Sequence, residues 1–87
     1  MTLEEFGKEI KLKKCVLKKI DEKTPGAHVP ANFTMRGTVC LLNEERIYLL
    51  NEHDSLTTGK IIHVGRTVDG ALLIETKNST YRLELHE

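Results

Sequence analysis

Hydrophobic and polar residues alternate along most of this chain from Phe33 onward. Successive side chains of a β-strand point to opposite faces, so a period of two predicts strands that each bury one face. The last strand shows this most clearly, because Tyr81, Leu83 and Leu85 alternate with polar neighbours. Polar turn residues separate the alternating segments. The strands predicted in this way cover residues 33–42, 46–50, 60–64, 71–76 and 79–85.

The first ten residues carry the signals of a short helix. Thr2 can cap its N-terminus, and a glutamate follows three residues later, which is the spacing of a capping box. Leu3, Phe6 and Ile10 recur at helical spacing and form one apolar stripe. We therefore expect a helix over residues 2–9.

Residues 11–20 fit two patterns. Leu12, Val16 and Ile20 form a helix face at a period of 3.6, and they share a strand face at a period of two. The β-forming run that starts at Cys15, with a turn after it, favours a strand. The alternative is a helix, which would give one long N-terminal helix packed on a sheet.

Residues 21–32 are predicted to form the longest connection of the chain. Thr24, Pro25 and Gly26 are typical of a turn, and Pro30 interrupts any regular element. Long connections on a rigid scaffold often carry function, so this loop is a candidate for a functional segment.

These elements predict a mainly β protein of the α+β class. A short N-terminal helix would precede an antiparallel meander of five or six strands, forming a curled sheet or a small SH3-like barrel. A chain of 87 residues leaves no room for a second core, so we expect one domain over residues 1–87, with the sheet within 11–87.

The charge balance limits the classes of partner. The chain has 13 basic and 13 acidic residues, whereas a dedicated nucleic-acid or membrane binder normally has a basic excess. A neutral chain is also more prone to self-association. No apolar run approaches the roughly 20 residues of a membrane helix, and the sequence starts with no signal peptide. We therefore expect a cytoplasmic protein with reduced cysteines.

No motif in the sequence predicts catalysis or a bound cofactor. The four histidines and two cysteines lack the spacing of a metal site. The chain also has no glycine-rich phosphate loop and no nucleophile elbow. The sequence thus predicts a protein that is not an enzyme and needs no metal or cofactor.

A run of lysines near the N-terminus is the most visible charge cluster. It could face the phosphates of a nucleic acid, but it contains no arginine and no interleaved aromatic residue for base recognition. The alternative is a solvated edge strand whose lysines discourage aggregation. The nucleic-acid-binding residues of the first interpretation are Lys11, Lys13, Lys14, Lys18 and Lys19.

The C-terminal part contains a Thr-x-Asn-Ser-x-Tyr pattern from Thr76 to Tyr81, preceded by a Thr-Thr-Gly-Lys-Ile-Ile run at residues 57–62. Together these segments resemble a recurring ending of small uncharacterised bacterial and phage proteins. The resemblance implies a bacterial or mobile-element origin, and no activity is attached to it. Asn78 and Ser79 also have a structural interpretation as a turn before the last strand.

The function predicted from the sequence is that of a non-enzymatic protein-binding or regulatory module. It would dock on another protein or on a second copy of itself. One alternative is a nucleic-acid-binding domain that uses the lysine run. Another is an oligomer that binds a small molecule or nucleotide between protomers. The candidate protein-binding residues are His28 and Val29 in the long loop, Tyr48 in a hairpin arm, and Arg66 in a turn.

Overall fold

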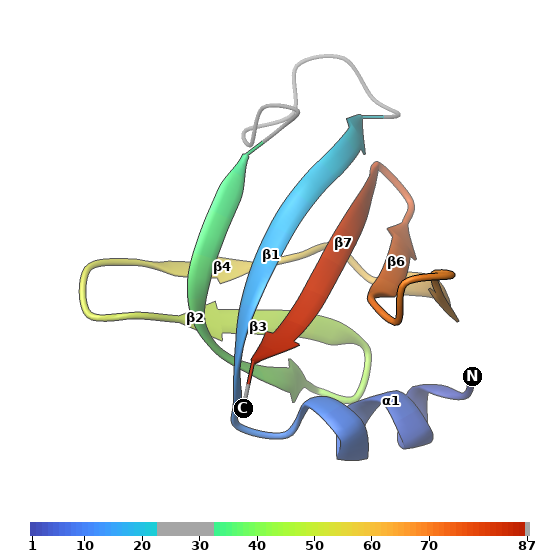
Figure 1. Ribbon diagram of the computed structural model, residues 1–87, viewed down its shortest axis with the longest axis horizontal. Coiled ribbons are helices and arrows are strands. Elements are labelled where there is room, and N and C mark those ends of the chain that lie inside the picture. Colours follow the sequence, from blue (N-terminus) through green and yellow to red (C-terminus); the bar gives the residue numbers. More distant parts are fainter. Residues whose placement is uncertain (23–32, 87) are drawn as a thin grey trace.

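A computed structural model describes residues 1–22 and 33–86 of the chain. These ranges contain one helix and seven strands, so the predicted mainly β class is confirmed (Figure 1). The strand count exceeds the five or six predicted, because a three-residue strand forms in a segment that the alternation of hydrophobic and polar residues does not mark as a strand. The elements are α1 (Leu3–Ile10), β1 (Lys13–Glu22), β2 (Thr34–Leu42), β3 (Arg46–Leu50), β4 (Ser55–Thr57), β5 (Ile61–Arg66), β6 (Leu72–Thr76) and β7 (Ser79–His86).

The strands form a single sheet in the order β4-β3-β2-β1-β7-β6-β5, and every neighbouring pair is antiparallel. The predicted single meander is therefore replaced by two. One runs from β1 to β4, the other from β5 to β7, and the pairing of β1 with β7 joins them. This pairing places the first and the last strand of the chain side by side in the middle of the sheet.

The sheet is rolled but not closed. Only residues 58–60 connect the two edge strands, β4 and β5, and such a segment spans about 10 Å, whereas six strand spacings of a flat sheet would separate the edges by about 29 Å. The Ile61 N–H also donates to the Glu45 carbonyl, 2.8 Å away. No ladder pairs β4 with β5, so the curled sheet is formed and the SH3-like barrel is not.

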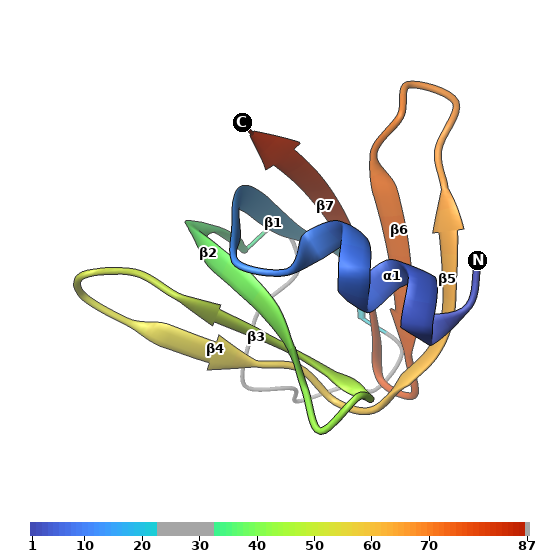
Figure 2. The same cartoon turned by 90° about the horizontal axis from the view of Figure 1, so that it is seen from below.

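Helix α1 lies across one end of the rolled sheet (Figure 2). The predicted capping box is present: the Thr2 side chain accepts a hydrogen bond from the Glu5 N–H at 3.1 Å, and the Glu5 carboxylate accepts one from the Thr2 N–H. Phe6 and Ile10 are fully buried beneath the helix. Gly7 allows a close approach, because a Cβ atom there would lie 3.1 Å from the Leu41 side chain.

Strand β1 settles the ambiguity of residues 11–20 in favour of a strand. Its core face is that of Cys15 and Leu17, while Leu12 and Ile20 are exposed. The apolar stripe of the helix alternative is therefore not the buried face. The hydrophobic core consists of Phe6, Ile10, Cys15, Leu17, Met35, Val39, Ile47, Leu49, Ile61, Val64, Leu72, Ile74, Tyr81 and Leu83.

Candidate docking surface

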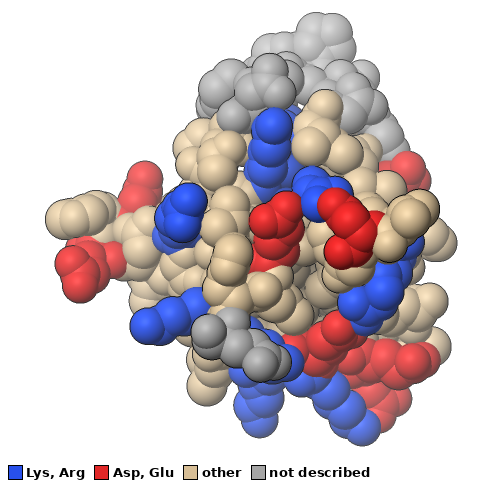
Figure 3. Space-filling view, viewed as in Figure 1, with Lys and Arg blue, Asp and Glu red and all other residues tan. Residues whose placement is uncertain are grey.

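The outer face of β2, β1 and β7 carries the charged side chains that do not enter the core. On β1, Lys14, Val16 and Lys18 alternate with the buried residues and point outward. The strand register places Val16 between Arg36 of β2 and Glu84 of β7. Figure 3 shows basic and acidic side chains side by side on this face.

Two shallow hollows cross this face, and both are lined by Val16. The hollow between β1 and β2 has a volume of about 400 Å³, and the second, toward β7, about 190 Å³. Leu50, which is 48% exposed, adds an apolar wall to the first hollow. We use the name cationic groove for the surface formed by Lys14, Val16, Lys18, Arg36, Leu50 and His86.

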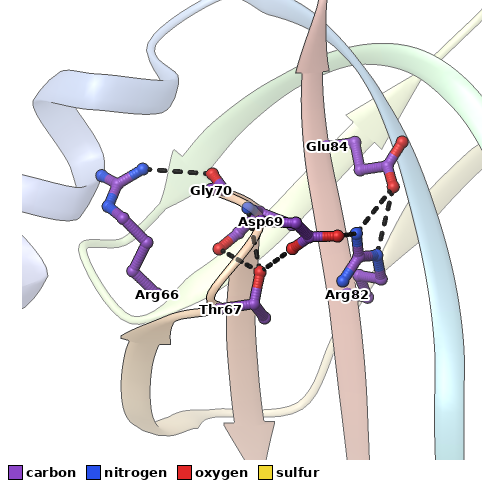
Figure 4. A network of polar contacts seen from close by, with 7 residues as sticks. Arg66, Thr67, Asp69, Gly70, Arg82 and Glu84 are labelled. Atoms are coloured by element: carbon purple, nitrogen blue, oxygen red, sulfur yellow. Dashed lines mark hydrogen bonds and ion pairs between the residues drawn. The ribbon is translucent and has the colours of Figure 1, made fainter.

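Two acidic residues next to the cationic groove, Glu84 and Asp69, are already bound to Arg82, whereas a third, Glu52, lines the first hollow. The Arg82 guanidinium donates from Nε to Glu84 Oε1 at 3.1 Å, and its Nη2 atom forms an ion pair with Asp69 (Figure 4). Lys14, Lys18 and Arg36 are exposed, and none forms a salt bridge with another described residue. The groove therefore presents three cations without an anionic partner beside an apolar floor.

The Asp69–Arg82 pair also fixes the β5–β6 turn against β7. Asp69 accepts a hydrogen bond from the Thr67 hydroxyl, whose oxygen accepts one from the Ala71 N–H at 3.0 Å. The side-chain hydrogen bond from Arg82, followed by that from Thr67, lowers the pKa of Asp69 well below its ordinary value. The same pair raises the pKa of Arg82.

We expect acid to loosen this turn. The pKa of Asp69 is lower in the folded chain than in the unfolded chain. Its contribution to the stability of the turn is therefore complete above the unfolded pKa of about 3.9 and is lost progressively as the pH falls below that value. The Gly70 amide should exchange with solvent faster below about pH 4, relative to core amides, as followed by NMR. In the Asp69→Asn variant, the Gly70 amide should exchange fast already at neutral pH, and its exchange should lose most of this pH dependence. If the protection of the wild-type Gly70 amide stays constant down to acid pH, the Asp69–Arg82 pair does not hold the turn.

Two of the residues predicted to bind protein lie in described parts of the chain. Arg66 forms an ion pair with Glu9 of α1 at 2.6 Å and donates to the Gly70 carbonyl at 3.2 Å, so it links the helix to the β5–β6 turn. Tyr48 is half-buried on the outer face of β3, opposite Cys40 and outside the cationic groove. His28 and Val29 lie outside the described residues.

The predicted lysine run does not form one continuous surface. Lys14 and Lys18 belong to the cationic groove, whereas Lys11 follows α1 and lies beside the helix. Lys13 is half-buried, and Lys19 is only 1% exposed. Lys19 therefore cannot face a phosphate from this surface, because it lies on the core side of β1.

Arg36 is the one of the three cations of the groove that sequence reasoning missed. The alternation of residues 33–42 places it on the polar face of its strand. Its position beside Val16 depends on the pairing of β1 with β2, and no local pattern of the sequence encodes that pairing.

The arrangement offers binding of anionic groups by ammonium and guanidinium donors. Burial raises the pKa of the Cys15 thiol to about 11, so this group stays protonated at neutral pH. The part of the chain that the structure describes holds no group of three or more histidine, cysteine, aspartate or glutamate side chains placed to bind a metal. Across residues 1–22 and 33–86, no helix has the length and apolar character needed to cross a membrane.

Comparisons with protein-family models, with curated proteins and with solved structures find no match for this chain. The C-terminal pattern thus assigns the chain to no recognised family.

Proposed function

We propose that this protein is a non-enzymatic docking module that binds an acidic segment of a partner protein in the cationic groove. The observation that supports this proposal is the local charge. Glu84 and Asp69 are engaged by Arg82, whereas Lys14, Lys18 and Arg36 form no salt bridge with any other residue that the structure describes. Such groups attract and orient an anionic partner.

The surroundings of the cations favour a peptide over a nucleic acid. Val16 and Leu50 provide apolar contacts for the side chains of a peptide. Among the described residues, no phenylalanine, tyrosine or tryptophan lines either hollow of the groove, so His86 is the one described side chain there on which a base could stack.

The test is charge reversal inside and outside the groove. A short fluorescein-labelled peptide of alternating glutamate and leucine serves as the probe, and fluorescence anisotropy measures its dissociation constant at low salt. The double variant Lys14→Glu, Lys18→Glu should weaken binding about tenfold or more, because two attractions become repulsions. The matched control Lys60→Glu, Lys77→Glu changes the net charge equally at exposed positions outside the groove and should retain binding.

A single-stranded oligonucleotide of the same net charge is measured in parallel. Tighter binding of the oligonucleotide, lost in the groove variant, would replace the proposed partner with a nucleic acid. If both double variants weaken peptide binding equally, only the net charge matters, and the proposal that the groove is the binding site is refuted. Circular dichroism of each variant confirms that the sheet is intact.

A further inference from the structure

A separate hollow lies between α1 and the β2–β3 hairpin. Its volume is about 800 Å³, and it shares no lining residue with the cationic groove. Its walls are mostly apolar, and charged residues stand at its rim. The apolar lining consists of Leu3, Gly7, Leu12, Cys40 and Leu41, and the charged residues are Glu4, Lys8, Lys11 and Glu44.

Leu12 at the edge of this hollow has a backbone conformation that is costly for a leucine. Its φ angle of 54° lies in the left-handed region, where a Cβ atom is disfavoured. It follows Lys11, the C-cap of α1, at the position where helices usually place glycine. Yet the Leu12 side chain is 69% exposed and gains little burial within the chain. Strain of this kind is often retained where the residue has a function.

The charges at the rim are complementary to one another. Glu4 and Lys8 form an exposed pair at 3.5 Å. Lys11 and Glu44, of opposite sign, form no salt bridge with any other described residue. In a two-fold symmetric interface each contact occurs twice with its members exchanged. Lys11 of one copy can therefore face Glu44 of the other, and the reverse, without a net charge at the interface.

We propose that the hollow beside α1 is a self-association surface, in which Leu12 of each copy packs into the hollow of the other. The protruding leucine and the apolar hollow lie side by side, which is the arrangement that an isologous contact requires. The formal net charge of the chain is zero, so overall repulsion does not oppose the contact. This surface is separate from the cationic groove, so the proposal of self-association and the proposal of peptide binding can be refuted independently.

The first test is Leu12→Gly. Sedimentation velocity over a dilution series measures the dimer dissociation constant. Thermal unfolding at a low protein concentration measures the melting temperature of the monomer. We expect the dissociation constant to rise about tenfold or more, because the dimer loses two buried leucines. The monomer should melt at a higher temperature, because glycine relieves the left-handed strain. An unchanged dissociation constant, or a wild-type chain that stays monomeric at every concentration, would overturn the proposal.

The second test exchanges the rim charges. Lys11→Glu and Glu44→Lys should each weaken the dimer severalfold, because each places like charges opposite one another. The double variant should restore the wild-type dissociation constant, since it restores opposite signs across the interface. Additive weakening in the double variant would refute the predicted contact. Binding of the acidic peptide probe by the double variant reports separately on the cationic groove.

Discussion

Replacing Phe6 with alanine should lower the free energy of unfolding by about 3–5 kcal/mol, one of the two largest effects expected here. Phe6 is fully buried and fixes α1 on the open end of the rolled sheet. Its removal leaves a cavity beneath a helix of eight residues, and a helix this short depends on tertiary packing for its stability. Urea denaturation followed by circular dichroism measures the loss.

The matched control for Phe6→Ala is Lys8→Ala on the same helix. The Lys8 side chain is 80% exposed, and within the described residues it forms only the surface pair with Glu4, so its loss should cost no more than about 0.5 kcal/mol. If the two variants unfold at the same urea concentration, α1 does not contribute to the core in solution. That result would also undermine the hollow beside the helix, because α1 forms one of its walls.

Local features of the fold could be predicted from the sequence because local interactions determine them. The capping box at Thr2 and the apolar stripe of Phe6 and Ile10 act within a few residues, and the helix forms at Leu3–Ile10. The alternation of Tyr81 and Leu83 with polar residues likewise marks β7, where both side chains are buried. Signals of this kind identify elements but say little about which elements are neighbours.

The arrangement of the sheet could not be predicted because it depends on contacts between distant parts of the chain. Alternation within residues 79–85 does not reveal that β7 pairs with β1, and the rolled shape follows from that pairing. Strand β4 was missed because three residues carry too little alternation to be recognised. Lys19 was assigned to the surface because residues of its type rarely lie fully buried.

The candidate surfaces show the same limit. Lys14 and Lys18 were recognised as part of a basic run, but the groove needs Arg36 from the neighbouring strand. It also needs Arg82 of β7 to bind Asp69 of the β5–β6 turn, which is a contact between two elements. The strain at Leu12 was not predictable, because leucine gives no signal for a left-handed backbone. A function carried by a surface therefore leaves fewer traces in a sequence than a catalytic motif does.

The second large effect is expected for Gly37→Ala, which should lower the free energy of unfolding by about 2–3 kcal/mol. Neither pairing of β2 has a register shift at or beside Gly37. β2 curves along its length (Figure 1), and its pairing passes from β1 to β3 at Thr38, next to Gly37. A Cβ atom at Gly37 would lie 2.5 Å from the Leu50 carbonyl oxygen. Because this neighbour is backbone, relief requires that β3 move away from β2.

The control for Gly37→Ala is Gly59→Ala, where a Cβ atom would meet nothing closer than the Thr76 Cβ at 3.8 Å. Both substitutions reduce the entropy of the unfolded chain equally, so the difference between their free energies of unfolding isolates the clash with Leu50. Urea denaturation should place Gly59→Ala within about 0.5 kcal/mol of the wild type. Because Leu50 also forms a wall of the cationic groove, Gly37→Ala should weaken binding of the acidic peptide probe even when the chain remains folded. Equal stability of the two variants would mean that β2 and β3 do not approach this closely at Gly37, and the shape of the groove would then be wrong as well.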